Sequence, residues 1–472
     1  MAHLRIFRHY IHTPFVFTAL LEGVVLFFAA YLGHFTRFGL FPGFSEHFVF
    51  ALTFAGVLLF FMVAMGVYEA RLREGYVGVM LRTAVAVFLL GTIGMALVLF
   101  LFPDLVLGRG VLLFASIEGF LLVAVLRWLT SNFVDEDFMK SRVLILGTGQ
   151  RAVKVASRMR RRSDRRAFVL DGFMQLAGTP NLIAEFGAHV IAYPESGLAA
   201  YCATHDIDQI VVAADDRRAD GDSAGGIPFE ELMDCRLSGV DVCEVQNFIE
   251  REACKIDVDL LQRSWLVYSD GFVTNWYRAL IKRLFDIVVA TLLFIGFLPI
   301  ILISGLAILV CDKFRGPLFY RQQRVGKNGT LFTVVKFRTM QVDAEDNGAM
   351  WAEYNDPRTT RVGAFLRRSH LDELPQLLNV IRGDMSMVGP RPERPVFVNQ
   401  LNSVIPYYEE RHRMQPGITG WAQLCYPYGA SIEDAKEKLQ YDLYYVKNHS
   451  ILLDMIILLQ TVEVVLVGEG SR

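Results

Sequence analysis

Long apolar runs dominate the first quarter of the chain. Four of them cover residues 15–35, 48–68, 77–102 and 111–129. Each has about 19 to 26 residues, enough for a helix to cross a hydrocarbon core about 30 Å thick. A buried helix of a soluble protein seldom continues so far without polar residues. The pattern therefore predicts a membrane α-helical bundle of four spans within residues 1–135.

Three ionisable residues lie in or near these runs, namely Glu22, Arg82 and Glu118. A charge inside a membrane is costly, so it either marks a functional position or finds a partner on a neighbouring helix. Long side chains near helix ends also extend to the membrane surface. We favour pairing or extension to the surface, and a function stays open as the alternative.

The loops between the runs differ in their basic residues. Lys and Arg precede the first run, separate the second from the third and follow the fourth, as Arg5, Arg8, Arg71, Arg73, Arg127, Lys140 and Arg142. The other two loops are poor in both. Cytoplasmic loops of membrane proteins carry an excess of Lys and Arg, so we expect both ends of the four-helix unit in the cytoplasm.

Residues 141–262 change to a soluble pattern. Short strand-like runs at 142–146, 168–173, 209–213 and 240–245 indicate strands, the first of them buried, with helical patterns between them. Alternating strands and helices favour a parallel sheet covered by helices on both faces. We expect a Rossmann-like α/β domain here.

A glycine loop follows the first of these strands. Gly147-x-Gly149-x-x-Ala152 resembles the dinucleotide-binding fingerprint, and Asp171 follows about 20 residues later. Arg151 and the three arginines at 160–162 would also favour an anion. Two interpretations stay open: a retained nucleotide or regulatory ligand, and a structural or dimer-forming role, which we favour.

A fifth apolar run covers residues 285–310 and is basic on both sides, with Lys282 and Arg283 before it and Lys313 and Arg315 after it. An ordinary fifth span would carry the C-terminal part out of the cytoplasm, against the charge of both flanks. Pro299 in the middle removes a backbone hydrogen bond and bends a helix. We predict a re-entrant helix–break–helix that enters one leaflet and returns; a single kinked span is the alternative.

Composition agrees with a protein that is partly in the membrane. Hydrophobic residues make up 53% and charged residues 20% of the chain, and the mean hydropathy is +0.35. The net charge of −2 gives no overall attraction to nucleic acid, so any basic function must come from local clusters. The six cysteines form no Cys-x-x-Cys pair or metal-ligand spacing, which is typical of free thiols in a reducing compartment.

Local basic clusters gather after residue 316. Fixed positive charge comes from Lys336, Arg338, Arg367, Arg368 and Arg391. Arginine matches the geometry of phosphate with a two-pronged guanidinium. Arg391 lies in Gly389-Pro390-Arg391-Pro392, a stiff, turn-forming sequence that would hold its side chain at little entropic cost.

Acidic residues accompany these clusters. Asp372 and Glu373 are adjacent, just before a predicted helix at 374–381. Neighbouring carboxylates can divide their roles, one as nucleophile and the other as metal ligand or acid/base. Asp384 and Glu393 would add oxygen ligands suited to Mg²⁺. Taken singly, such motifs are usually helix caps, solvated faces or turns, so the co-occurrence carries the argument.

Five motifs in order resemble the bacterial sugar transferase family, the monotopic polyprenyl-phosphate phosphoglycosyl transferases. They are Lys-Arg-Leu-Phe-Asp at 282–286 (with Leu284 as an insertion), Lys-Phe-Arg-Thr-Met at 336–340, Leu-Asp-Glu-Leu-Pro-Gln at 371–376, Gly-Asp-Met-Ser-Met-Val-Gly-Pro-Arg-Pro-Glu at 383–393, and Pro-Gly-Ile-Thr-Gly-Trp-Ala-Gln at 416–423. Four spans and a Rossmann-like domain before them resemble the large subclass. The resemblance implies a mainly helical α/β catalytic domain at 278–472 with its re-entrant helix at 285–310.

The resemblance also implies an activity: transfer of a sugar 1-phosphate from a UDP-sugar to undecaprenyl phosphate, with release of UMP. Asp372 would form the covalent phosphosugar intermediate, and Glu373 would position the lipid phosphate or Mg²⁺. The implied Mg²⁺ ligands are these same two carboxylates. The remaining substrate- and phosphate-binding residues would be Lys336, Arg338, Arg367, Arg368, Pro390, Arg391, Pro392, Glu393 and Gln423.

The same resemblance implies partners and a place in the cell. The partners would be UDP-sugar, undecaprenyl phosphate, membrane lipid and a second copy of the chain, with no nucleic acid. The protein would lie in the bacterial inner membrane with its active site facing the cytoplasm, and would initiate exopolysaccharide, O-antigen or capsule synthesis. The sequence leaves the sugar open.

Three rival interpretations were weighed. A membrane sugar-nucleotide 4,6-dehydratase would need a Tyr-x-x-x-Lys pair, which residues 141–262 lack. A membrane scaffold or chain-length regulator would not need Asp372 and Glu373 beside ordered arginine clusters. An inactive homologue is harder to reconcile with every expected catalytic position being filled.

Overall fold

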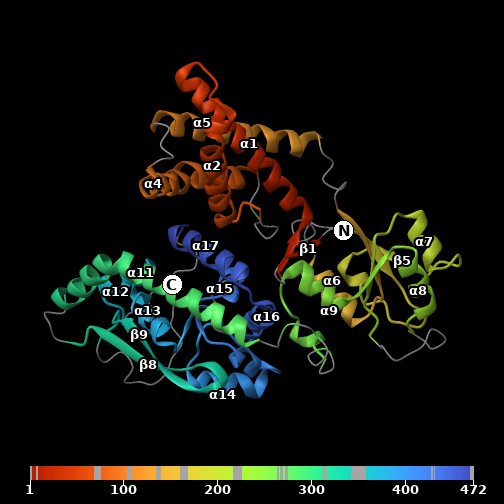
Figure 1. The fold of residues 1–472 in the computed structure, drawn as a ribbon. Helices are drawn as coiled ribbons and strands as arrows, with labels where there is room; N and C mark the ends of the chain where they lie inside the picture. The colour runs from red at the N-terminus through yellow and green to blue at the C-terminus, as the bar shows by residue number, and fades with distance from the viewer. Residues whose placement is uncertain are drawn as a thin grey trace. The chain divides into compact units, whose positions relative to one another are not determined.

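The computed structural model of the 472-residue chain divides into two compact units. One comprises Met1–Ile6 and Tyr10–Ala253, and the other Phe7–His9 and Cys254–Arg472 (Figure 1). The structure describes residues 3–6, 9–68, 76–103, 109–133, 140–159, 168–215, 226–262, 265, 269, 271, 275–311, 316–341, 358–426, 429 and 431–467. The basic residues Arg8, Arg71, Arg73, Lys313 and Arg315 and those at 160–162 lie outside this part of the chain.

Apolar helices make up the N-terminal part of the first unit. The elements are β1 (His3–Ile6), β2 (His9–His12), α1 (Thr13–Phe38), α2 (Phe44–Ala64), α3 (Tyr76–Ala84), the π-helix η1 (Val85–Gly91), α4 (Thr92–Leu101) and α5 (Arg109–Phe133). Because α3, η1 and α4 follow without interruption, they form one helical run. Five helices of the described residues are long and apolar enough to cross a membrane, and four of them belong to this unit.

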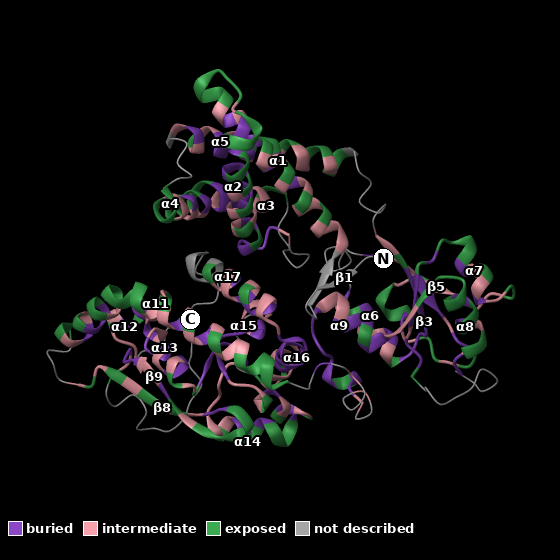
Figure 2. Cartoon of the chain, viewed as in Figure 1, coloured by how far each residue is buried: buried purple, intermediate pink, exposed green. Residues whose placement is uncertain are grey.

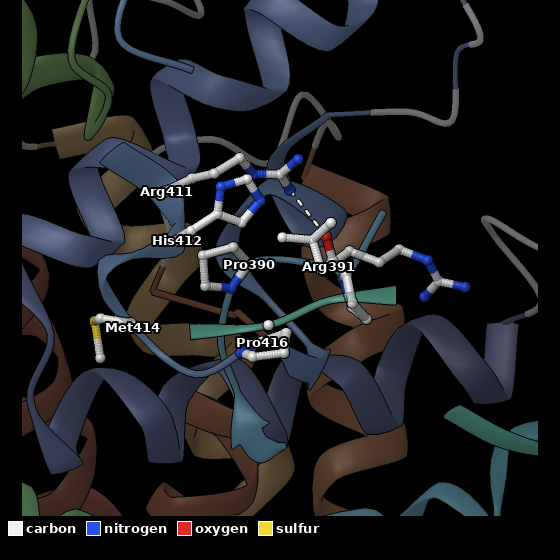
Figure 3. A pocket seen from close by; sticks show the side chains of 9 residues that line it. Pro390, Arg391, Arg411, His412, Met414 and Pro416 are labelled. Carbon is white, nitrogen blue, oxygen red and sulfur yellow. Dashed lines mark hydrogen bonds between the residues drawn. The ribbon is translucent and has the colours of Figure 1, made fainter. Parts of the chain in front are cut away.

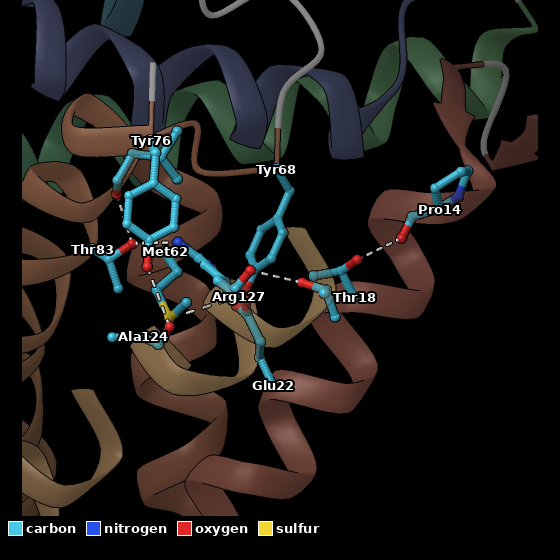
Figure 4. A network of polar contacts seen from close by, with 11 residues as sticks. Pro14, Thr18, Glu22, Met62, Tyr68, Tyr76, Thr83, Ala124 and Arg127 are labelled. Carbon is cyan, nitrogen blue, oxygen red and sulfur yellow. Dashed lines mark hydrogen bonds and ion pairs between the residues drawn. The ribbon is translucent and has the colours of Figure 1, made fainter. Parts of the chain in front are cut away.

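A polar network lies inside this helical bundle (Figure 4). Glu22 on α1 is fully buried and receives two hydrogen bonds from Arg127 on α5, at 2.5 and 2.7 Å. The Tyr68 hydroxyl donates to the same carboxylate at 2.5 Å, and Arg127 also donates to Thr83 on α3 at 2.7 Å. Pairing, one of the two interpretations of Glu22, is therefore confirmed. Glu118 accepts a hydrogen bond from the Thr36 hydroxyl.

The rest of the first unit is an α/β domain. Its elements are β3 (Ser141–Leu146), α6 (Gln150–Arg158), β4 (Phe168–Met174), η4 (Ala184–Phe186), β5 (Val190–Ile191), α7 (Leu198–Thr204), β6 (Gln209–Val212), α8 (Phe229–Leu237), β7 (Asp241–Glu244) and α9 (Val245–Ala253). The five strands are all parallel, in the order β5-β4-β3-β6-β7. The predicted parallel sheet is confirmed, and the two-residue strand β5 is an addition to it.

Strand β3 lies at the centre of this sheet, which explains its sequence. Four consecutive residues, Val143 to Leu146, are buried, because helices cover both faces of a parallel sheet. Figure 1 shows α6 and α9 on one side of the strands and α7 and α8 on the other, and Figure 2 shows that α7 and α8 carry most of the exposed helical surface. The continuous apolar run in the sequence reflects this two-sided burial.

The second unit is mainly helical with two small sheets. Its elements are η5 (Val258–Leu260), α11 (Trp276–Cys311), β8 (Phe319–Val325), η6 (Lys327–Gly329), β9 (Leu331–Phe337), α12 (Arg361–Arg368), η7 (Leu371–Glu373), α13 (Gln376–Arg382), β10 (Ser386–Val388), α14 (Pro395–Val404), η8 (Tyr408–Arg413), β11 (Gly417–Thr419), α15 (Trp421–Cys425), α16 (Ile432–Asn448) and α17 (Ile451–Val467). β8 pairs with β9 antiparallel and β10 with β11 parallel.

Helix α11 differs from the predicted helix–break–helix. It is one continuous helix of 36 residues that contains Pro299 and begins well before residue 285. Each end has a buried side, at Asp286 and Ala290 near its start and at Ile308 near its end. The six residues 295–300 between them are all exposed. Six residues exceed one helical turn, so this apolar stretch around the proline is uncovered on every side.

Polar contacts fasten the start of α11 to the strand before the Gly-Pro-Arg-Pro sequence. Asp286 accepts hydrogen bonds from the Ser386 hydroxyl at 2.8 Å and from the Met387 N–H at 3.2 Å, both in β10. Lys282, one turn earlier, pairs with Asp454 of α17 at 2.8 Å. At the other end of α11, Ile308 packs with residues of β9 and α12. The predicted membrane helix is thus joined to the domain that carries the candidate site.

The second unit also includes a segment that the sequence placed at the end of the α/β domain. The Trp421 indole donates to the Cys254 carbonyl at 3.0 Å. Lys255 pairs with Glu437 at 3.1 Å, and the Ile256 N–H donates to the Gln440 carbonyl. Residues 254–261 therefore pack against α15 and α16.

Candidate active site

The acidic pair lies in a short 3₁₀ turn between α12 and α13. Helix α12 begins at Thr360, whose hydroxyl accepts the Gly363 N–H at 2.9 Å. The chain leaves the helix through His370, which has φ +54°. This left-handed residue reverses the chain, so Asp372 points inward and is only 8% exposed.

Glu373 joins three segments that are far apart in the sequence. Its Oε1 accepts hydrogen bonds from Lys336 Nζ at 2.5 Å and from Arg391 Nη2 at 2.7 Å. Lys336 comes from β9 and Arg391 from the loop after β10. The structure thus brings together four of the residues predicted from the motifs, with Asp372 next to Glu373 in the chain.

The pKa values of the two neighbouring carboxyl groups are shifted in opposite directions. Burial and the negative charge of Glu373 raise the pKa of Asp372 to about 6, although Lys336, Arg367 and Arg391 act in the opposite direction. Burial would also raise the pKa of Glu373, but the Arg391 and Lys336 charges outweigh it and hold this pKa well below the usual range. Glu373 is therefore a permanent anion, whereas Asp372 is poised to change charge near pH 6.

The other arginines of the predicted set are distributed unevenly. Arg367 donates to the Thr339 and Thr359 hydroxyls at 2.9 and 3.2 Å, and its charge acts on Asp372. Arg368, the next residue on α12, is exposed. Arg338 is buried with its guanidinium against the backbone at Gly316. Of these three arginines, Arg367 is the one whose charge lowers the pKa of Asp372.

The loop of residues 389–393, which contains the Gly-Pro-Arg-Pro sequence, is held by β11. The Gly389 N–H donates to the Thr419 carbonyl, and the Gly417 N–H donates to the Pro390 carbonyl, both at 3.0 Å. A Cβ at Gly389 would lie 2.4 Å from the Gln415 carbonyl oxygen, so only glycine fits there. The close approach of the two chain segments fixes the base from which the Arg391 side chain extends.

Two further residues line a pocket beside this loop. Its wall consists of Arg324, Val334, Lys336, Gln376, Arg391, Pro392 and Gly417. Arg324 of β8 also pairs with Glu393 at 3.5 Å and donates to the Pro392 carbonyl at 3.2 Å. Neither Arg324 nor Gln376 was among the residues predicted for the site. Gln376 stood within the Leu-Asp-Glu-Leu-Pro-Gln motif, but Arg324 had no local signal beyond a position after the apolar run.

Two predicted residues make contacts outside the acidic pair. The Gln423 amide of α15 donates to the carbonyl of Ile418 in the preceding strand β11, at 3.5 Å. Asp384 is exposed and accepts a hydrogen bond from the Asn379 amide at 3.2 Å. Within the part of the chain that the structure describes, no group of three or more His, Cys, Asp or Glu side chains is arranged to hold a metal ion.

The acidic pair nevertheless fits one kind of metal binding. Mg²⁺ often takes one or two protein carboxylates and completes its shell with substrate phosphates and water. Asp372 and Glu373 supply two adjacent carboxylates, and the surrounding cations would accept phosphate. These residues suit an ion that arrives with a diphosphate better than one that the protein holds by itself.

The glycine loop of the α/β domain is already occupied by a carboxylate. Asp215 accepts hydrogen bonds from the Gln150 N–H at 2.8 Å and from the Arg151 N–H at 2.9 Å, at the start of α6. A Cβ at Gly149 would lie 2.0 Å from the Asp215 carboxylate. Gly147 has φ +126°, and Ala152 is buried. The chain thus supplies its own anion at the position expected for a phosphate.

The other residue predicted for this nucleotide site also has an internal partner. The Asp171 carboxylate on β4 accepts a hydrogen bond from the Tyr201 hydroxyl on α7 at 2.8 Å. In dinucleotide-binding domains the acidic residue at this point instead accepts from a ribose. Both acidic groups near the glycine loop are therefore used within the fold.

The second unit is a domain on an apolar helix with an acidic pair set among lysine and arginine. The model of the bacterial sugar transferase family matches residues 277–468. The uncharacterized sugar transferase EpsL of Bacillus subtilis is 40% identical over 197 residues, which are 41% of this chain and 91% of that protein. The chain therefore belongs to the bacterial sugar transferase family.

Two other relatives have activities in their names. The UDP-N-acetylgalactosamine-undecaprenyl-phosphate N-acetylgalactosaminephosphotransferase of Aeromonas hydrophila is 38% identical over 241 residues, 51% of this chain and 56% of that protein. The UDP-glucose:undecaprenyl-phosphate glucose-1-phosphate transferase of Escherichia coli is 42% identical over 185 residues, 39% of either protein. The chain thus spans about half or less of the length of these two relatives, which differ in the sugar they name.

Proposed function

We propose that this protein transfers a sugar 1-phosphate from a UDP-sugar to undecaprenyl phosphate and releases UMP. The observation that carries the proposal is the division of roles between two adjacent acids. Asp372 is buried with a raised pKa, and Glu373 is held as an anion by Lys336 and Arg391. The names of relatives in the same family support the donor and the acceptor.

The first step would be an attack by Asp372. Its carboxylate oxygen forms a bond to the sugar-proximal phosphorus of the UDP-sugar, and the bond from that phosphorus to the bridging oxygen breaks. UMP leaves with the electron pair. A carboxylate that has lost water around it is a better nucleophile, and burial provides this for Asp372. Negative charge grows on the departing phosphate, which Arg391 and Lys336 would stabilise.

The second step returns the phosphosugar to a lipid. A phosphate oxygen of undecaprenyl phosphate forms a bond to the same phosphorus, and the bond to the Asp372 oxygen breaks. The aspartate carboxylate is restored, and the product is an undecaprenyl diphosphate sugar. Glu373 keeps Lys336 and Arg391 in place through both steps, because its Oε1 binds both cations.

Mg²⁺ would be held by Asp372 and Glu373 together with the diphosphate of the donor. When bound, it would offset negative charge on the phosphate that departs. Lys336, Arg391 and the neighbouring Arg324 supply fixed positive charge at the same place.

We also propose the placement in the membrane. Helix α11 would dip into one leaflet as a continuous helix bent at Pro299 instead of a broken one, since Asp286 near its start and Ile308 near its end are buried and residues 295–300 between them are exposed. The four helical runs before the α/β domain would cross the inner membrane and leave both soluble parts in the cytoplasm. In that arrangement Asp372 meets a soluble nucleotide and a lipid at the membrane surface.

The α/β domain would be Rossmann-like and structural. Its strand order places the first strand at the centre with the chain continuing outward on both sides, as in doubly wound sheets. Asp215 at the start of α6 favours a structural role over nucleotide binding. Dimerisation through the full chain, and a role in starting exopolysaccharide, O-antigen or capsule synthesis, remain predictions from the family resemblance.

The test is UMP release by membranes that contain the protein, with Mg²⁺, undecaprenyl phosphate and a panel of UDP-sugars. We expect UMP with one or a few sugars and none with Asp372→Asn. Glu433→Gln is the control, because Glu433 is an exposed acid on α16 of the same domain and was not predicted for the site. Release of UDP would indicate an ordinary glycosyl transferase. No release with any donor would favour a membrane scaffold.

A further inference from the structure

A buried ion pair lies directly behind the Gly-Pro-Arg-Pro loop. Arg411 of η8 and Asp442 of α16 are 6% and 2% exposed, and Arg411 Nη2 lies 2.8 Å from Asp442 Oδ2. Arg411 Nη1 donates to the Tyr408 hydroxyl at 2.5 Å. The same guanidinium donates through Nη2 to the backbone carbonyl of Arg391 at 3.0 Å (Figure 3).

Stability alone gives a weak reason for such a pair. Removing two charges from water costs about as much as their attraction returns, so well-packed apolar residues usually serve as well or better. A buried ion pair is better explained by a geometric task. Besides Asp442 and Tyr408, the Arg411 guanidinium contacts the backbone carbonyl of Arg391. The side chain of Arg391 in turn donates to Glu373.

The backbone of the loop is fixed one residue at a time. The Gly389 N–H and the Pro390 carbonyl bond to β11, the Pro392 carbonyl bonds to Arg324, and the Glu393 carbonyl bonds to the Val325 N–H. The carbonyl of Arg391 completes this series through Arg411. The bond from Arg411 is the one made to Arg391 itself, whose side chain carries the charge proposed to bind phosphate. The position of that side chain therefore depends on this bond most directly.

We propose that Arg411 and Asp442 form a positioning pair that aims Arg391 at the phosphate groups of the donor. Asp442 holds the Arg411 guanidinium in place through its charge, and Arg411 donates to the Arg391 carbonyl. Neither residue contacts the substrate. The proposal rests on the proposed function, because that function gives Arg391 its phosphate.

The test is a double-mutant cycle in which the measured quantity is the affinity for UDP. UDP is a nucleoside diphosphate, and its binding can be measured without catalysis. Arg411→Lys keeps a positive charge for Asp442, but a single ammonium cannot reproduce the fork that reaches Tyr408 and the Arg391 carbonyl together. We expect UDP binding by the full-length protein in detergent to weaken about 10-fold, and UMP release to slow about 100-fold, as for a misplacement of about 1 Å. In an Arg391→Ala background the same Arg411→Lys change should have no further effect on either quantity.

Two controls separate positioning from folding. Arg413→Lys changes an exposed arginine of the same element, paired with Glu410, and should leave UDP affinity unchanged. Tyr408→Phe removes only the hydroxyl that accepts from Arg411 and should weaken UDP binding in the same direction by a smaller factor, even if Arg411→Lys proves unstable. Melting temperatures of all variants are measured alongside.

The outcomes are distinct from those of the proposed function. Equal losses from Arg411→Lys with and without Arg391 would overturn the positioning role, as would full UDP affinity in the folded fraction of both Arg411→Lys and Tyr408→Phe. Wild-type protein that binds UDP but releases no UMP with any donor would contradict the proposed function and leave the positioning result standing.

Discussion

Two loops of this protein have sequences typical of phosphate binding, and their surroundings in the structure differ in charge. In the glycine loop at 147–152, the two backbone N–H groups at the start of α6 are both used by Asp215. In the loop at 389–393, Arg391 binds Glu373, but Lys336, Arg324 and Arg367 add further positive charge around it. An incoming phosphate would have to displace a carboxylate in the first loop, whereas it finds surplus cations in the second.

The difference shows what decides whether an anion site is open. Both loops have donors in the right place, and both have an internal carboxylate that accepts from them. The balance of fixed charge differs, because neutral N–H groups are satisfied by one carboxylate and a cluster of three or four cations is not. The largest effects of mutation should therefore fall on the second loop.

Removing the central cation of that loop should have the largest effect. Arg391→Ala should lower kcat/KM for UMP release by about 10²–10³-fold, the usual loss when a donor to a developing negative charge is removed. Arg151→Ala in the glycine loop is the matched control and should stay within about twofold, as for a substitution away from an active site. Both are measured as initial rates with the donor that wild type prefers. Equal losses in the two variants would contradict the contrast between the loops.

A substitution in the glycine loop should instead lower the stability of the α/β domain. Gly149→Ala places a Cβ 2.0 Å from the Asp215 carboxylate. We expect a local cost of about 1–3 kcal/mol, as for other overpacked sites, seen as faster amide exchange of β3 and α6 in the full-length protein. Asp215→Ala removes the clashing group, so Gly149→Ala should cost much less in that background. An unchanged cost there would show that the clash has another source.

The pH profile offers a finer comparison, between the two acids that lie beside the second loop. Asp372 must be ionised to attack, and its pKa is raised to about 6, so kcat/KM should fall as the pH drops through 6. The Glu373 charge raises that pKa and Arg391 and Lys336 lower it. Glu373→Gln removes the charge that raises it, so the acidic limb should move to lower pH even though the rate itself falls.

That shift assigns the acidic limb to Asp372. Burial also raises the pKa of Asp442 to about 6, but the charges that act on it come from Arg411, Glu393 and Lys438. A limb that stays in place in Glu373→Gln would point to Asp442, or to a group on the substrate. Rates of wild type and variant between pH 5 and 8 at saturating lipid decide between these.

The residues that the sequence revealed share one property: their signal is local. Residues 143–146 and 210–213 are apolar throughout because the centre of a parallel sheet is buried on both faces. Asp372, Glu373 and Arg391 stood in short motifs of unusual composition. Such patterns can be read without knowing which segments meet.

The residues that the sequence missed depend on contacts between distant segments. Arg411 and Asp442 are 31 positions apart, and Asp215 follows Gln150 by 65. A pair of this kind leaves no period and no motif, and its members look like ordinary surface charges. The motifs of Arg338 and Gln423 likewise do not reveal their contacts: the Arg338 guanidinium lies against Gly316, and the Gln423 amide donates to the Ile418 carbonyl.

The smallest predicted effect is a gain of binding in the glycine loop. Asp215→Asn removes the negative charge and keeps only one acceptor oxygen, so at least one of the N–H groups of Gln150 and Arg151 becomes available to an external anion. We expect ADP, used as a probe, to raise the melting temperature of this variant slightly at millimolar concentration and to leave wild type unchanged. Asp241→Asn changes the acid at the start of β7 in the same sheet; this variant is the control and should not respond. A wild-type protein that ADP already stabilises would show that Asp215 yields its place to phosphate, and the two loops would then differ in degree of occupation instead of in kind.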